Sequence, residues 1–127
     1  MNNNKTDVKE LIVIIGASMD PSRYSYMAAH RLVQAGYSIV NVGLKNGEVA
    51  GKEITHQLDP GLNPHTITLY INPSIQSNYV DAIIASNPKR VIFNPGTENP
   101  SIYPFLESKG IFCEEACTLV LLSTGRF

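Results

Sequence analysis

Apolar residues gather in five short runs, separated by stretches with a different spacing. The runs cover residues 11–15, 38–42, 66–71, 90–93 and 111–113. The first run contains no polar residue at all. Continuous apolar runs of this length are typical of strands buried on both faces, as in a parallel sheet covered by helices. We therefore expect five strands in a parallel sheet.

The stretches between these runs carry helical spacing. Tyr26, Ala29, His30 and Val33 fall on one face of a helix over residues 25–35, and Gly36 would end it. Further helices are predicted over residues 74–86, 101–109 and 115–122. Residues 43–64 are rich in glycine and proline, and we expect a loop there with at most a turn or a short helix.

Strands that alternate with helices predict an α/β fold with right-handed crossovers. We expect a doubly wound, five-stranded parallel sheet of order 3-2-1-4-5 with helices on both faces. No repeat, low-complexity tract or linker divides residues 1–127, so a single domain is expected. Ligands of such sheets bind beyond the carboxyl ends of the strands, where the order reverses. This order puts that point between the first and fourth strands, near residues 16–24, 43–45, 72–73 and 94–99.

Charge and composition narrow the class of partner. The net charge is -1, which gives no sign of a nucleic-acid-binding protein or of binding to an anionic membrane surface. The apolar runs are too short to span a bilayer, and residues 1–9 lack the apolar segment of a signal peptide. Two cysteines fit a reducing compartment. We expect a cytoplasmic protein, with a protein partner or a homo-oligomer left open.

The turn after the first strand has features of an anion-binding loop. Gly16 allows a tight turn, and the N–H groups of the small residues Ala17 and Ser18 lie near the start of the next helix, whose dipole favours an anion. Arg23 adds a guanidinium group suited to phosphate oxygens. Ser18 and Pro21 stand where a dinucleotide fingerprint has its second and third glycines. The alternative is a plain strand–turn–helix with Ser18 as a helix cap.

The end of the second strand bears on the type of nucleotide. Sheets that bind NAD usually carry an acidic residue there to hold the ribose hydroxyls. No Asp or Glu lies between Ser38 and Lys45. An uncharged strand end followed by Lys45 suits a phosphorylated ribose, which leaves NADP or coenzyme A.

The histidines, cysteines and neighbouring glutamates give weaker indications of a functional site than the two strand ends do. The three histidines are far apart and have no metal-ligand spacing. Cys113 and Cys117 are expected to be buried structural thiols, because their spacing is not that of a redox pair. Glu114 and Glu115 are expected at a strand-to-helix turn, with a general acid–base pair as the alternative. The sequence shows no nucleophile with a partner base, so no catalytic residue is predicted. Since the histidines lack metal-ligand spacing, no metal site is predicted either.

The sequence resembles a known family. "VIIGAS", "PSRYSY", "AGYSIVNV" and "GEVAGK" look like segments of the small stand-alone coenzyme A-binding proteins with a Rossmann-like fold. Their domain is similar to the coenzyme A-binding domain of succinyl-CoA synthetase. The chain departs from the family pattern after the second strand, where a proline-containing run is usual, and after the fourth, where Trp-x-Gln-x-Gly is usual.

The resemblance implies which residues surround a ligand. The first loop would hold the pyrophosphate, the second strand's tip the 3′-phosphorylated ribose, the third strand's tip the adenine, and "NPG" the pantetheine arm. In chain order these residues are Gly16, Ala17, Ser18, Arg23, Tyr24, Ser25, Gly43, Lys45, Ile71, Asn72, Pro73, Asn94, Pro95 and Gly96.

We therefore expect non-catalytic binding of coenzyme A or an acyl-CoA. Two alternatives stay open at this stage. One is an NADP-binding oxidoreductase subunit, and the other is a fold retained for protein–protein contact with a decayed ligand site.

Overall fold

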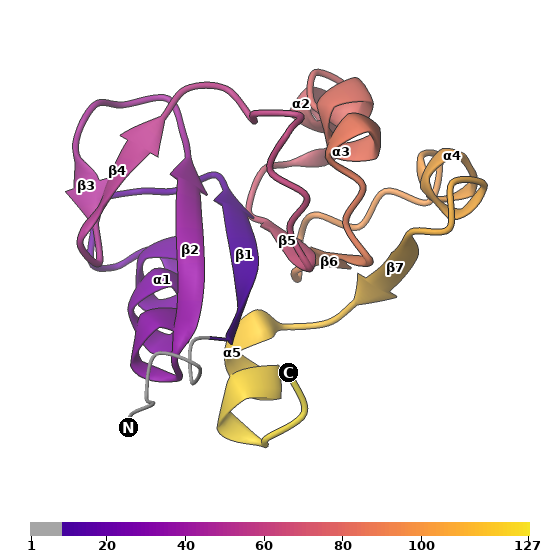
Figure 1. Ribbon diagram of the computed structural model, residues 1–127. Coiled ribbons are helices and arrows are strands. Elements are labelled where there is room, and N and C mark those ends of the chain that lie inside the picture. The colour runs from indigo at the N-terminus through magenta and orange to yellow at the C-terminus, as the bar shows by residue number, and fades with distance from the viewer. Residues whose placement is uncertain (1–8) are drawn as a thin grey trace, which may run out of the picture.

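A single twisted sheet with helices on both faces forms the protein. The computed structural model describes residues 9–127 (Figure 1). Its strands are β1 Lys9–Ile15, β2 Tyr37–Val42, β3 Glu48–Val49, β4 Lys52–Thr55, β5 Thr66–Leu69, β6 Arg90–Phe93 and β7 Phe112–Glu115. Its helices are α1 Tyr24–Gln34, α2 Pro73–Gln76, α3 Val80–Ser86, α4 Tyr103–Glu107 and α5 Thr118–Ser123.

The apolar run of β1 is buried on both of its faces. Ile12 and Ile14 point into one core with Ala29 and Leu32 of α1, and Leu122 of α5 packs against it. Alternate residues of β1 point the other way, into a second core that contains Ile83 of α3, Leu106 of α4, Phe93 and Val91. Side chains alternate across a strand, so one continuous apolar run supplies both cores. Helices α1 and α5 thus cover one face of the sheet and α3 and α4 the other (Figure 1).

The prediction of five strands in the order 3-2-1-4-5 is wrong. The sheet has seven strands in the order β3-β4-β2-β1-β5-β6-β7. Strand β4 pairs in parallel with β2, at the place that the prediction gave to the run at residues 66–71, and that run is β5, which pairs with β1. The six parallel strands, counted in chain order, follow 3-2-1-4-5-6. The order therefore reverses between β1 and β5.

The missed strands lie in the segment that we expected to be a loop. Strand β4 buries only Ile54, and β3 has two residues that pair antiparallel with β4. A strand with one buried side chain shows no alternation of apolar and polar residues in the sequence, because that pattern needs several apolar positions. The prediction for residues 43–64 failed for this reason.

Two helix predictions also change. The helix expected over residues 74–86 is interrupted, because Gln76 turns inward and its side-chain amide donates to the carbonyls of Ile71 and Thr97. The helix expected from residue 115 begins at Thr118, since β7 continues to Glu115. Glu114 lies in that strand, 3.1 Å from the Arg90 guanidinium, so neither glutamate begins a helix.

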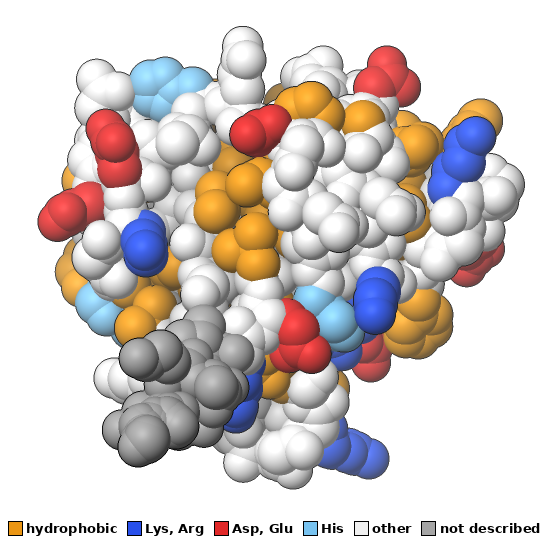
Figure 2. Space-filling view, viewed as in Figure 1, with side chains coloured by type: hydrophobic (Ala, Val, Ile, Leu, Met, Phe, Trp, Pro, Cys, Tyr) orange, Lys and Arg blue, Asp and Glu red, His pale blue; other side chains and the backbone are white. Residues whose placement is uncertain are grey.

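Charged side chains are scattered over the face shown in Figure 2, where acidic and basic groups are interspersed and hydrophobic side chains reach the surface near its middle. No helix within residues 9–127 has the length and apolar character needed to cross a membrane.

A buried amide fastens the β3–β4 hairpin to the sheet. Asn41 on β2 is fully buried, and its Nδ2 donates to the carbonyls of Val49 and Lys52, both at 3.0 Å. In the part of the chain that the structure describes, its Oδ1 has no hydrogen-bond partner. One side chain of β2 therefore bonds to both strands of the hairpin.

Asn41→Asp tests this role with almost no change in shape. The new carboxylate oxygen would face two carbonyl oxygens in a buried site, so the free energy of unfolding should fall by at least about 2 kcal/mol. Urea titration measures the change. Asn46→Asp, at an exposed position, is the matched control and should change stability by less than about 0.5 kcal/mol. Equal transition midpoints for the two variants would show that Asn41 does not hold the hairpin.

Candidate functional site

A cleft of about 690 Å³ lies beyond the carboxyl ends of the central strands. It opens where the strand order reverses, between β1 and β5, which is where ligands bind in open α/β sheets. All but two of the residues predicted around a ligand line this cleft. The exceptions are Pro73 and Asn94. That these residues contact a ligand remains a prediction.

The turn out of β1 fits tightly between two neighbouring strands. Gly16 has a φ of +98°, and a Cβ at this position would lie 2.8 Å from the carbonyl oxygen of Tyr70. The N–H groups of Gly16 and Ala17 both donate to the Val42 carbonyl, at 2.8 and 2.9 Å. The N–H of Ala17 is therefore used by the fold, contrary to the expectation that it faces an anion.

The N-terminus of α1 borders the cleft without a side-chain cap. The cap residue is Arg23, which makes no capping hydrogen bond, and the first turn holds no acidic residue. The first N–H groups of a helix have no partner within the helix, and the helix dipole makes this end positive. Arg23, Tyr24 and Ser25 all line the cleft. This end of α1 is therefore uncapped and positive at the edge of the cleft, and its binding of an anion stays a prediction.

An acidic residue that sequence reasoning passed over also lines the cleft. Asp20 lies 3.8 Å from Arg23, and both side chains are largely exposed. The backbone N–H and hydroxyl of Ser22 donate to the Asp20 carboxylate and lower its pKa. Asp20 is thus charged at neutral pH and competes with any bound phosphate for Arg23. Ser18 accepts a hydrogen bond from the Asp20 N–H, which leaves its own hydroxyl proton free to donate.

The tip of β2 forms a second wall. Gly43 lies against the first loop, and a Cβ on it would be 2.6 Å from the carbonyl oxygen of Ala17. Beyond it, Leu44 and Lys45 line the cleft with exposed side chains, while Ile54 of β4 contributes from beneath. The contribution of β4 could not be foreseen, because the strand itself was not predicted.

The segment after β5 forms a third wall. Ile71, Asn72 and Ile75 line it, and Asn78 and Tyr79 extend it. The Asn72 side chain accepts a hydrogen bond from the Ser74 N–H and so caps α2. Pro73 occupies the first turn of that helix, outside the cleft lining.

Asn94 has a structural position that the sequence did not reveal. It is 3% exposed. Its Nδ2 donates to the Thr68 hydroxyl at 2.7 Å and to the Leu69 carbonyl at 2.8 Å, and its Oδ1 accepts from the Thr118 N–H. Asn94 therefore joins β5, β6 and α5, while the next residues, Pro95 and Gly96, line the cleft.

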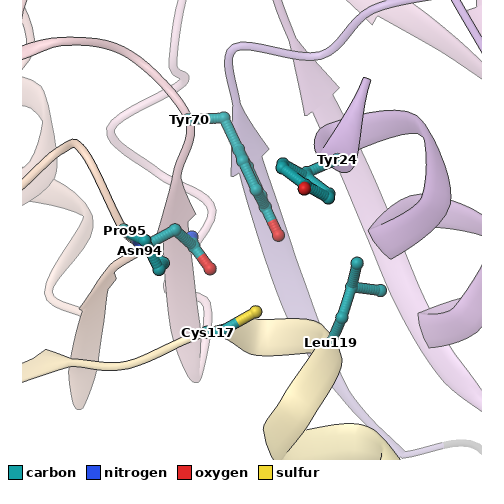
Figure 3. Close-up of a pocket in the computed structure, with 6 residues that line it drawn as sticks. All are labelled: Tyr24, Tyr70, Asn94, Pro95, Cys117 and Leu119. Atoms are coloured by element: carbon teal, nitrogen blue, oxygen red, sulfur yellow. The ribbon is translucent and has the colours of Figure 1, made fainter. Parts of the chain in front are cut away.

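A smaller pocket of about 230 Å³ adjoins the cleft (Figure 3). We call it the side pocket; its lining residues are Tyr24, Tyr70, Asn94, Pro95, Cys117 and Leu119. The cleft and the side pocket share three of these residues: Tyr24, Tyr70 and Pro95. The sequence gave no signal for Tyr70 or Leu119, and Cys117 was expected to be a buried structural thiol.

The Tyr70 hydroxyl is buried and has no hydrogen-bond partner among residues 9–127. The hydroxyls of Thr68 and Thr118 lie near it and bond to each other at 2.8 Å. Burial raises the pKa of Tyr70 to about 12. At neutral pH it is therefore a proton donor with no acceptor, which is rare in a folded interior.

The other ionisable residues lie outside the cleft lining. Glu115 accepts a hydrogen bond from the Tyr103 hydroxyl, and Glu114 pairs with Arg90. Burial raises the pKa of the half-buried Cys113 to about 11, so only a small fraction of its thiol is ionised at neutral pH and it reacts slowly. Within residues 9–127, no three His, Cys, Asp or Glu side chains are grouped so as to hold a metal ion.

Gly43→Ala tests how closely the two loops approach. The added methyl group would overlap the Ala17 carbonyl, and overpacking of this kind lowers the free energy of unfolding by about 1–3 kcal/mol. Gly61→Ala is the control, because its Cβ would meet only the flexible Asp59 side chain, at 3.4 Å. Thermal or urea unfolding should separate the two variants. If both unfold like the parent protein, the first loop and the tip of β2 do not pack as described.

Solved structures resemble this one over most of its length. The crystal structure of an uncharacterized protein is 44% identical, with a TM-score of 0.89, and the match covers 93% of this chain and 98% of that chain. A protein from Thermus thermophilus is 23% identical with a TM-score of 0.80, covering 93% and 90%. A hypothetical protein from Pyrococcus horikoshii OT3 is 24% identical with a TM-score of 0.81, covering 89% and 81%. The last two establish likeness of fold alone.

No curated protein matches the chain. The family described as "CoA binding domain" matches residues 10–123, which is nearly all of it. That span includes the first loop, the tip of β2, the segment after β5 and the residues that follow β6, so it contains the whole cleft. This chain therefore belongs to the CoA binding domain family.

Proposed function

We propose that the protein binds coenzyme A or an acyl-CoA in the cleft, without catalysing a reaction. The family match over residues 10–123 carries the proposal. The cleft at the reversal of strand order supports it, because its volume is that of a typical small-molecule site. The uncapped N-terminus of α1 is the natural place for the pyrophosphate.

Charge near the cleft favours a phosphorylated ribose. Lys45 lines the cleft beyond the tip of β2, and that strand carries no carboxylate to accept hydrogen bonds from ribose hydroxyls. Arg23 adds a second cation near the α1 N-terminus. The 3′-phosphate of coenzyme A would be bound by Lys45 in this arrangement, and the pyrophosphate by the helix end with Ser18 and Arg23.

The cleft favours binding over catalysis. Its ionisable side chains are Asp20, Arg23, Tyr24, Lys45, Tyr70 and Tyr79. Among them Asp20 is tied to Ser22 and Arg23, and Tyr70 keeps its proton at neutral pH. The Ser22 hydroxyl donates to Asp20, but Ser22 does not line the cleft, so no pair of nucleophile and base faces a bound ligand.

Thermal unfolding with four nucleotides tests the function directly. Coenzyme A at about 100 times its dissociation constant should add about 2.7 kcal/mol of stability. For a domain of this size the midpoint should rise by about 8–15 °C. Dephospho-coenzyme A, NADP and NAD serve as parallel samples, and smaller rises are expected with each. A larger rise with NADP would favour an oxidoreductase subunit, and no rise with any of the four would contradict nucleotide binding.

Lys45→Ala tests which phosphate the lysine contacts. It should weaken coenzyme A about fivefold, because an exposed ion pair is worth about 1 kcal/mol, and it should leave dephospho-coenzyme A nearly unchanged. Calorimetric titration gives both affinities. Lys52→Ala removes an exposed lysine outside the cleft lining and should change neither. Equal losses for the two ligands in Lys45→Ala would rule out a contact between Lys45 and the 3′-phosphate.

A further inference from the structure

The side pocket lies where four elements meet without filling the space between them. Tyr24 begins α1, Tyr70 follows β5, Pro95 follows β6, and Cys117 and Leu119 lie at the start of α5. The side chains converge on one space, with the Tyr70 hydroxyl and the Cys117 sulfur directed toward it (Figure 3). Carbon atoms make up most of its wall, and no Asp, Glu, Lys, Arg or His is among its lining residues.

The size of the side pocket limits what can enter. An apolar cavity of about 150 Å³ holds a molecule the size of benzene. The side pocket, at about 230 Å³, therefore has room for a chain of about four to six carbons. It adjoins the cleft and shares Tyr24, Tyr70 and Pro95 with it, which puts it next to any ligand bound in the cleft.

We propose that the side pocket receives the acyl chain of a short, uncharged acyl-CoA. This inference rests on the proposed function and specifies its ligand. The orphan hydroxyl of Tyr70 would donate a hydrogen bond to the thioester carbonyl or to a nearby pantetheine amide, which gives that buried donor its missing acceptor. The carbons of the chain would then lie against Leu119, Pro95 and the tyrosine rings.

The residues that line the side pocket also limit the charge that the acyl chain can carry. A carboxylate at the end of the chain would enter a space with no cationic side chain among its lining residues, and burying an unpaired charge is strongly unfavourable. Butyryl and succinyl groups have the same number of carbons but differ in this terminal charge. The side pocket should therefore select butyryl-CoA over succinyl-CoA.

Titration calorimetry with coenzyme A and its acetyl, butyryl, hexanoyl and succinyl thioesters provides the test. Each buried methylene should raise affinity about fourfold, so butyryl-CoA should bind about fifteenfold more tightly than acetyl-CoA. Succinyl-CoA should bind no more tightly than free coenzyme A. If all five ligands bind equally well, coenzyme A binding stands and the acyl pocket is overturned. If none binds, the proposed function fails with it.

A pair of variants on α5 ties the effect to the side pocket. Leu119→Trp fills the space and should reduce the ratio of butyryl-CoA to coenzyme A affinity, both measured on the same variant, to about one. Val120→Trp places the same side chain at the next position, which is 54% exposed and outside the pocket, and should keep the parent ratio. A parent ratio in Leu119→Trp would overturn the inference.

Protection of Cys117 from alkylation gives a second readout on the unmodified protein. Butyryl-CoA should slow the reaction of Cys117 with iodoacetamide more than coenzyme A does, as measured by peptide mass spectrometry. Cys113 lies outside the side pocket and serves as the internal reference, with the same rate under either ligand. Equal protection of Cys117 by the two ligands would place the acyl chain elsewhere.

Discussion

The turn out of β1 depends on a single carbonyl oxygen. Val42, the last residue of β2, accepts hydrogen bonds from both Gly16 and Ala17, while the Tyr70 N–H donates to the carbonyl of Ile15. The chain thus leaves β1 held between the tips of its two neighbours, with room for no side chain at Gly16. This turn determines where α1 begins. It therefore also determines where the positive N-terminus of α1 meets the cleft. The cleft walls are positioned relative to it.

The sequence revealed the elements whose apolar runs are continuous. Strand β6 begins and ends at the predicted residues, and α1 begins one residue earlier than predicted. These elements are legible because they are buried on two faces or carry a clear apolar stripe. Strand β4 was missed because it buries Ile54 alone, and that one omission also gave the wrong strand order, since β4 takes the place beside β2. The order of strands in a sheet cannot be predicted correctly when one of the strands is not recognised.

Site prediction used the rule that ligands bind at strand ends, and most of the residues it named line one cleft, while their contact with a ligand stays a prediction. Parallel strands bring their carboxyl ends to one edge of the sheet, so loops far apart in sequence surround one cleft. It was less informative for residues whose role depends on tertiary contacts. Asn94 was predicted beside a ligand and lines the side pocket, but the hydrogen bonds by which it joins β5, β6 and α5 had no signal in the sequence. Tyr70 and Leu119 had no pattern to identify them, because the side pocket exists only where α5 packs beside the sheet.

The β3–β4 hairpin has a consequence for the behaviour of the molecule in concentrated solution. The outer edge of a parallel sheet presents unpaired N–H and C=O groups to which a strand of another molecule can add. Here β4 is covered on that side by β3, a strand of only two residues that runs antiparallel to it. Very short terminal strands offer little length for intermolecular pairing. By holding this hairpin in place, the buried amide of Asn41 protects one side of the sheet from self-association into extended β-structure.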